Sequence, residues 1–558
     1  MTVIDVDLRK APFSLDDEAI GWVEATLSDL TQDEKIGQLF VLIAMGDPGA
    51  AIADLKRFQP GGVTRFYGPD LAAEIAFARE FISSSKVPPL LSADLEGSRM
   101  SLPFGTPVPN PLGLAAVDDV QATSAISSIM AREAREMGLN WSFTPVIDIN
   151  KAFRSAIVGT RSYGSEVDRI ERHALAQIAA FQAEGVAATV KHWPGEGYDD
   201  RDQHLVTTIN PLSIEDWEAS FGKLYRAAID AGVLSVMSAH IAFPAFIRSL
   251  DPDAGLEAYR PASISAVLNQ TLLRERLGFN GLIVSDATPM GGLGAFSSRD
   301  THLAELIANG CDVILFADHP EEDFARIRKA LASGALSQQR FEDAVRRILG
   351  LKARLGLHKP YPLPDLDRAR ANLATRQSLA TASHATARVP TLVKDTQNLL
   401  PLDPARHRRV LVYSGGVVHP LAPAPMPFAV PDMLRAEGFE VTVHAPGQHL
   451  EPKDFDLVLY LFGDETLLTR SNIFIDWMKL TGSLGGAMTR PWHDVPTLMV
   501  SFGYPYLLYD APRVPTYINA YGTYDAMQQA VVEALMGRKA FEGSSPVDPF
   551  CGLEDARY

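Results

Sequence analysis

A loop near the middle of the chain combines residue types that can move protons. Asp202 and His204 stand two residues apart, shortly after a run of proline and glycine at 194–197 that predicts an irregular loop. A carboxylate beside an imidazole can fix its tautomer and tune its basicity, so His204 could act as acid and base near neutral pH. The alternative is two solvated loop residues. The basic pair Lys191 and His192, just upstream, favours the catalytic interpretation.

A second reactive group is predicted at Asp286. The apolar run Gly281–Ser285 delivers this residue to the end of a buried strand. An ionised Asp there could attack an electrophilic carbon. Taken without other evidence, Asp286 is better interpreted as a helix N-cap, a position that Asp also favours.

Other polar residues follow predicted strands. Asp94 could accept hydrogen bonds from the hydroxyls of a polyol, and Arg161 offers a planar fork of donors. Glu96 and Arg99 lie three residues apart, and we expect them to pair and brace their loop. His240 also follows a strand, where a lone His is more often structural than catalytic.

These side chains require a scaffold that brings strand ends together. Helical patterns, such as 122–137, 170–184, 217–231 and 262–277, alternate with short apolar runs through the first 350 residues or so. This alternation predicts an α/β fold, a (β/α)8 TIM-type barrel with its active site at the C-terminal strand ends. The runs predicted as strands are 39–43, 62–67, 89–93, 141–145, 187–191, 234–238, 281–285 and 313–316.

A second domain is expected after a proline-rich segment. We predict a catalytic barrel over residues 1–357, a linker over 358–384 and an α/β sandwich domain over 385–558. The apolar runs 410–414, 457–462 and 497–502 predict buried parallel strands in this second domain, and the patterns 433–437 and 524–536 predict covering helices. The tail after residue 549 is expected to be loosely held.

Composition narrows the class of protein. With 51 basic and 68 acidic residues, the net charge of −17 argues against nucleic acid or an anionic membrane as a partner. No apolar stretch approaches the roughly 18 residues of a membrane span, and the charged N-terminus does not resemble a signal peptide, so we expect a cytoplasmic enzyme. The two cysteines provide no zinc spacing and the histidines no helical ligand spacing, so no metal or other cofactor is expected.

Taken together, these motifs resemble glycoside hydrolase family 3, in particular the two-domain β-N-acetylhexosaminidases of bacterial peptidoglycan recycling. The resemblance is most specific at Lys191–His204, where the family carries KHFPGHG followed by Asp-x-His. The Asp-x-His loop separates this branch from the family's β-glucosidases. The other segments that carry the resemblance are Leu30–Gln38, Phe143–Asn150, Gly159–Gly164, Leu399–Leu402 and Tyr517–Tyr521.

The resemblance implies a carbohydrate substrate and a role for each residue. Asp286 would be the nucleophile of a retaining mechanism, His204 the acid/base and Asp202 the group that orients His204. No cofactor would be needed. The residues that would hold the sugar are Asp94, Arg161, Lys191 and His192.

The sequence also departs from the family pattern. Ser98 replaces a glycine, Leu102 a sugar-binding arginine, Glu196 a histidine and Ala287 an aspartate. The reaction type is therefore better supported than the sugar. We keep three hypotheses open: a β-N-acetylhexosaminidase, a glycosidase or phosphorylase of the same scaffold with a different glycone, and a sugar-binding protein without activity.

Overall fold

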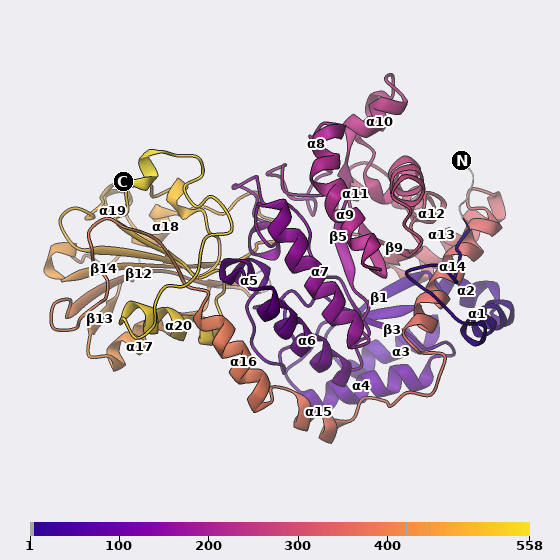
Figure 1. The fold of residues 1–558 in the computed structure, drawn as a ribbon, viewed down its shortest axis with the longest axis horizontal. Helices are drawn as coiled ribbons and strands as arrows, with labels where there is room; N and C mark the ends of the chain where they lie inside the picture. The colour runs from indigo at the N-terminus through magenta and orange to yellow at the C-terminus, as the bar shows by residue number, and fades with distance from the viewer. Residues whose placement is uncertain (1–4, 420–421, 446) are drawn as a thin grey trace.

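The computed structural model describes residues 5–419, 422–445 and 447–558 of the 558-residue chain. The chain forms two domains. In Figure 1 the first domain, which contains the N-terminus, lies on the right, and the second lies on the left.

The first domain is built on a barrel. Its described residues form a sheet of eight parallel strands in the order β4-β3-β2-β1-β10-β9-β7-β5. Parallel bridges from Trp141 to Ala187 and from Val146 to Lys191 join the two outer strands, so the sheet closes on itself. The strands are β1 Phe40–Ala44, β2 Gly62–Arg65, β3 Leu90–Ala93, β4 Trp141–Ser142, β5 Thr189–Trp193, β7 Ser235–Ser238, β9 Leu282–Ala287 and β10 Val313–Leu315. The predicted TIM-type barrel is confirmed, because each predicted apolar run contributes one strand.

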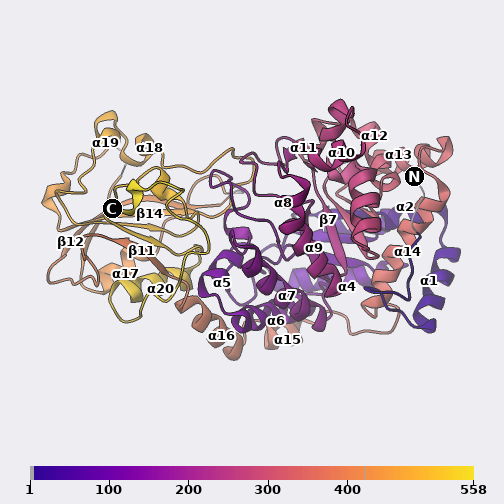
Figure 2. The same cartoon turned by 45° about the horizontal axis from the view of Figure 1, so that its top comes forward.

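Helices surround this barrel (Figures 1 and 2). The α-helices are α1 Asp17–Asp29, α2 Gln32–Gln38, α3 Pro48–Phe58, α4 Leu71–Ser84, α5 Pro111–Val117, α6 Val120–Glu136, α7 Val167–Ala183, α8 Ile214–Ala219, α9 Phe221–Asp230, α10 Pro244–Leu250, α11 Gly291–Gly294, α12 Arg299–Ala308, α13 Pro320–Ser333 and α14 Gln338–Arg354. Shorter elements are β6 Thr208–Ile209 and β8 Ile241–Ala242, which pair with each other, and the 3₁₀ turns Gly159–Arg161, Gly255–Tyr259 and Ala262–Ile264.

Two predicted helices differ in detail. The helix expected over 217–231 is interrupted at Ser220, whose hydroxyl donates to the carbonyl of Asp216 and so competes with the helical ladder. The helix expected over 262–277 is a 3₁₀ turn followed by a π-helix, Val267–Arg276.

The second domain contains a six-stranded sheet in its described residues. The order is β11-β16-β15-β14-β12-β13, parallel except for the antiparallel edge strand β11. Figure 1 shows α17 and α20 below this sheet and α18 and α19 above it. The strands are β11 Thr391–Asp395, β12 Arg409–Val418, β13 Glu440–Val443, β14 Leu457–Asp464, β15 Thr497–Ser501 and β16 Thr516–Asn519. The helices are α17 Val430–Ala436, α18 Trp477–Thr481, α19 Leu484–Met488 and α20 Asp525–Leu535, with 3₁₀ turns at Pro452–Asp454, Leu507–Tyr509 and Asp555–Arg557.

Helices connect the two domains. The segment 358–384, which we expected to be a linker, contains α15 (Leu366–Asn372) and most of α16 (Arg376–Ala387). The first of these helices packs against α4 and α6, and the second against α5, α6 and α20. The connection therefore packs first against the barrel domain, and its second helix contacts both domains.

The C-terminal tail is held more firmly than we expected. The ammonium of Lys394 donates to the carbonyls of Ala556, at 2.8 Å, and Tyr558, at 3.3 Å, and Ala556 is fully buried. The prediction of a loosely held tail is wrong, because a buried cation binds its carbonyl oxygens. Within the described ranges, no helix is long and apolar enough to cross a membrane.

One buried cation leads to a stability prediction. Lys352 on α14 is fully buried, and its ammonium donates to Oε1 of Gln38 at 2.6 Å. Burial lowers the pKa of Lys352 from its ordinary 10.5 to about 7. Because the unfolded chain binds this proton more tightly, this residue makes stability rise between about pH 7 and about pH 10.5. At pH 7 a shift of this size opposes folding by about 4 kcal/mol.

We expect Lys352→Met to raise the Tm of the barrel at pH 7, with a gain that shrinks towards pH 10. The gain should exceed the roughly 1–3 kcal/mol lost when Gln38 loses its partner. Calorimetry of the wild-type protein and of Lys352→Met at several pH values would measure the two Tm values. The exposed Lys359 provides a matched control, Lys359→Met, that should show no such pH dependence. A Tm that falls equally at every pH would contradict this account.

Candidate active site

The C-terminal ends of the barrel strands carry the polar residues that the sequence singled out. Asp94 follows β3, Lys191 and His192 lie at the end of β5, His240 follows β7, and Asp286 lies near the end of β9. Since the strands are parallel, all these side chains belong to one edge of the barrel.

Lys191 is held between two carboxylates. Its ammonium lies 2.5 Å from Oδ1 of Asp94 and 2.8 Å from Oε1 of Glu96. Two of its three N–H donors therefore face carboxylates, which leaves one for a further acceptor. Lys191 and Glu96 are buried, whereas Asp94 is partly exposed. The Lys191–Asp94 ion pair therefore places the Asp94 carboxylate at the accessible edge of the site.

Glu96 also binds Arg161. The guanidinium forms two parallel hydrogen bonds to the carboxylate, at 2.9 and 3.0 Å, and its Nη2 lies 3.4 Å from Nε2 of His192. Burial alone would raise the pKa of Glu96, but the charges of Arg161 and Lys191 bring it down to about 2. A permanently ionised Glu96 thus fixes two of the predicted sugar-binding cations.

The predicted pairing of Glu96 with Arg99 is wrong. Arg99 instead turns to the second domain, where it lies 3.6 Å from the carboxylate of Glu465 and donates to the carbonyls of Val418 and Thr466. The buried carboxylate of Glu96 is already occupied by Lys191 and Arg161. Arg99 therefore links the two domains.

Asp202 and His204 form a hydrogen-bonded dyad. Oδ1 of Asp202 lies 2.7 Å from Nδ1 of His204 and accepts the backbone N–H of the same residue at 2.8 Å. Burial alone would raise the pKa of Asp202, but the hydrogen bond from His204 holds it below its usual range. The His204 side chain is 24% exposed, whereas that of Asp202 is buried. An ionised Asp202 orients Nδ1–H and leaves Nε2 for a substrate.

The second domain also contacts this dyad. The backbone N–H of Thr469, in the segment after β14, donates to Oδ2 of Asp202 at 2.9 Å. Asp202 therefore accepts hydrogen bonds through both oxygens. The sequence contained no signal for this contact, because the two residues are 267 positions apart.

Asp286 lies on the strand that is next but one to β5. It is 9% exposed, and its Oδ1 accepts the N–H of Ala287 at 2.7 Å. Burial alone would raise the pKa of Asp286, but three nearby imidazoles and this N–H hold it below its usual range. The three imidazoles are those of His192, His240 and His204. The N-cap alternative is wrong, because the next helix, α11, begins at Gly291 after Met290.

The loop that carries Asp202 and His204 is bonded directly to the segment after β9. The N–H of Gly291, the first residue of α11, donates to the carbonyl of His204 at 2.8 Å. His240 braces the same region. Its Nδ1 lies 2.9 Å from the Ser263 hydroxyl and its Nε2 lies 3.0 Å from the Ala287 carbonyl, so both ring nitrogens have protein partners. A nucleophile candidate and a proton-transfer candidate thus share one site.

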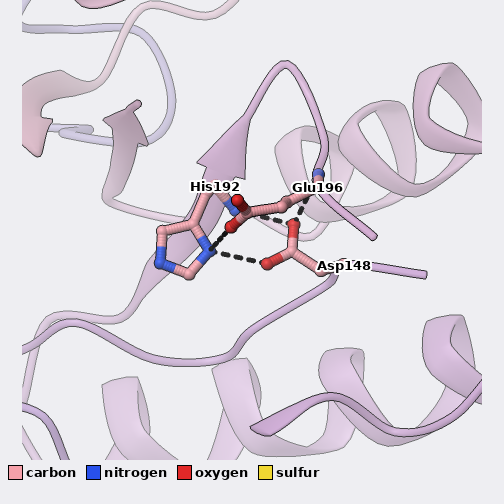
Figure 3. A group of neighbouring side chains, drawn as sticks. All are labelled: Asp148, His192 and Glu196. Atoms are coloured by element: carbon pink, nitrogen blue, oxygen red, sulfur yellow. Dashed lines mark hydrogen bonds and ion pairs between the residues drawn. The ribbon is translucent and has the colours of Figure 1, made fainter. Parts of the chain in front are cut away.

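Figure 3 shows a buried cluster of Asp148, His192 and Glu196. The sequence motifs predicted no role for Asp148. Nδ1 of His192 lies 2.6 Å from Asp148, which also accepts the backbone N–H groups of His192 and Glu196. Burial, and next the charge of Asp148, raises the pKa of Glu196 well above its usual range, which favours the neutral form of this side chain. The position of Asp148 shortly after β4 was the available signal.

The same three residues offer possible metal ligands. One atom from each of Asp148, His192 and Glu196 lies within 4.8 Å of the others. All three already have hydrogen-bond partners among the described residues. Hydrogen bonds therefore account for the cluster.

Leu102, which stands where the family usually has a sugar-binding arginine, is buried in the core of the barrel domain.

Comparison with known proteins identifies the family. The glycosyl hydrolase family 3 N-terminal domain matches residues 31–351. A β-N-acetylglucosaminidase/β-glucosidase of Cellulomonas fimi is 40% identical, with 99% of each chain covered. A β-hexosaminidase of Stenotrophomonas maltophilia (strain R551-3) is 30% identical over 49% of this chain and 77% of its own length.

Solved structures are also similar. The β-glucoside phosphorylase BglX bound to 2FGlc is 35% identical, with a TM-score of 0.91, 98% of this chain covered and 99% of that one. A family 3 β-N-acetylglucosaminidase from Paenibacillus sp. str. FPU-7, 24% identical, has the same fold with a TM-score of 0.79, with 94% of this chain and 100% of that one covered. The chain therefore belongs to glycoside hydrolase family 3 and is a glycosidase.

Proposed function

We propose that this protein cleaves terminal β-linked N-acetylhexosaminides, N-acetylglucosaminides above all, with retention of configuration. The observation that carries the proposal is the 2.7 Å contact of Asp202 with the accessible His204, in a loop bonded to the one after Asp286. The combined name of the Cellulomonas fimi relative supports a glycone of this class, and it extends the proposal to β-glucosides.

In the first step, the carboxylate of Asp286 attacks the anomeric carbon while the bond to the leaving oxygen breaks. His204, protonated on both nitrogens, donates its Nε2 proton to that oxygen. The products are a glycosyl ester on Asp286 and a free alcohol. Asp202 remains a carboxylate throughout and stabilises the imidazolium through Nδ1–H, which suits its lowered pKa.

In the second step, water attacks the anomeric carbon of the ester. The neutral Nε2 of His204 removes a proton from the water, and the ester bond to Asp286 breaks. Two displacements at one carbon retain its configuration. A histidine suits this double role, because an imidazole titrates near neutral pH without being buried, as a carboxylic acid would have to be.

The sugar would be held by the Glu96-centred cations. Asp94 would accept hydrogen bonds from sugar hydroxyls, and Lys191 has one N–H donor to spare. Arg161 would supply further donors at the same edge, and His192, whose Nε2 accepts from Arg161, would line it. Leu102 and Glu196 change the family's usual set of donors, so a comparison of aryl N-acetylglucosaminides with aryl glucosides tests the proposed glycone. Poor turnover of both would contradict it.

Phosphate is a second candidate acceptor. A neutral imidazole does not repel an anion as a carboxylate base would, and a similar structure is that of a β-glucoside phosphorylase. In that reaction a phosphate oxygen, in place of water, attacks the glycosyl ester and releases a sugar 1-phosphate.

We expect inorganic phosphate to speed turnover of activated aryl glycosides, because their slow step is breakdown of the ester. Sugar 1-phosphate should then appear beside free sugar, as measured by phosphorus NMR. Sulfate at equal ionic strength is the control. If phosphate changes neither the rate nor the products, the protein is a hydrolase alone. Either result leaves the assignments of Asp286 and His204 unchanged.

A further inference from the structure

Gln203 stands between the two members of the dyad, but its side chain points elsewhere. It is only 1% exposed, whereas His204 faces the accessible site. Its Nε2 donates to Oε2 of Glu196 at 3.0 Å, and its Oε1 accepts the backbone N–H of His240 at 3.0 Å. The amide thus ties the middle of the dyad loop to the ends of two barrel strands.

Glu196 is suited to be the partner of this amide. It is buried, and the charge of Asp148 nearby favours its neutral form. A neutral carboxyl can accept the Gln203 N–H without placing a second uncompensated charge beside Asp148. Its Oε2 also lies 3.9 Å from Nδ1 of His192, so Glu196 stands between the sugar-binding edge and the dyad loop.

The backbone of the loop has other supports. The carbonyls of Gln203 and His204 accept the N–H groups of Gly292 and Gly291, and Asp202 accepts that of Thr469. These bonds hold the main chain and the carboxylate. Among the described residues, the Gln203 side chain adds a bond back to Glu196, near the start of the same loop after β5, and a bond to His240, which follows β7.

We propose that Gln203 and Glu196 are positioning residues, which hold the dyad loop so that His204 can reach the leaving oxygen. The proposal rests on the acid/base role of His204. Proton transfer needs heavy atoms within about 2.6–3.2 Å, and a displacement of about 1 Å can cost 10²-fold. Loss of the anchor should therefore impair protonation of the leaving group rather than sugar binding.

The test uses Gln203→Ala and the nearly isosteric Gln203→Met in the full chain. For alkyl glycosides, which need an acid, we expect kcat/KM to fall about 10–100-fold. For dinitrophenyl glycosides we expect a loss of a few-fold at most. Glu196→Ala should show the same split, and Glu196→Gln, which keeps a neutral acceptor, should lose less. The double variant Glu196→Ala with Gln203→Ala should lose no more kcat/KM for alkyl glycosides than the less active of the two single variants, because both changes remove the same contact.

Gln177 offers a matched control. It is a buried glutamine on α7 that accepts the Tyr163 hydroxyl at 2.7 Å, so Gln177→Ala should affect both substrate classes alike. An equal loss on both classes for the Gln203 variants, or additive losses in the double variant, would overturn the proposal. So would variants that all fail to fold, because the contact would then serve stability. If His204→Ala itself shows no split, the proposed function fails first.

Discussion

Replacing Asp286 by alanine should abolish turnover of every glycoside that the protein accepts. The carboxylate is the group that would form the covalent ester, and its lowered pKa keeps it ionised across the neutral range. Removing a catalytic nucleophile typically costs on the order of 10⁴–10⁶-fold. Initial rates with an activated aryl glycoside would measure the loss. Thermal unfolding should show an intact fold, since among the described residues the side chain hydrogen-bonds only to its own neighbour Ala287.

Trapping identifies the nucleophile directly. A 5-fluoro N-acetylglucosaminide or a 2-fluoro glucoside with a good leaving group should add one glycosyl mass to the wild-type chain, at Asp286 within the β9 peptide. Asp286→Gly should regain activity with azide and release the glycosyl azide of inverted configuration. A label on a different residue would show that the nucleophile lies elsewhere. The buried carboxylate of Asp148 should carry no label, so the control variant Asp148→Asn should still be labelled at Asp286.

Replacing His204 by alanine should divide substrates by their leaving groups. General acid catalysis contributes about 10²–10⁴-fold, and an activated phenol needs little of it. We therefore expect kcat/KM, which reports the first step, to fall by that factor for alkyl glycosides and only slightly for dinitrophenyl glycosides. The reasons are that the imidazole is partly exposed and that the 2.7 Å bond to Asp202 orients its Nδ1.

The second step gives an independent measurement. His204→Ala also lacks the base for attack by water, so the glycosyl ester should accumulate with activated substrates, and azide should restore kcat. Asp202→Asn should retain part of the activity, because the imidazole remains in place with a weaker partner. A uniform loss on all leaving groups would remove His204 from the acid role.

The sequence alone determined the architecture of the catalytic domain. Parallel strands that are buried on both faces require continuous apolar runs, and each of the eight runs became a strand. The polar residue after such a run must lie at the strand's C-terminal end, which located Asp94, Lys191 and Asp286 on one edge. The Asp202–His204 contact was predictable as well, because two residues so close in sequence can meet without any tertiary contact.

Only the tertiary structure decided which distant groups became partners. Arg99 bonds to the second domain and not to Glu96, Thr469 caps Asp202, and the backbone N–H of His240 donates to the amide of Gln203. Nothing in local spacing encodes these choices. Buried polar groups must find hydrogen-bond partners wherever the packed fold offers them, and which partner is within reach depends on the placement of whole elements and domains.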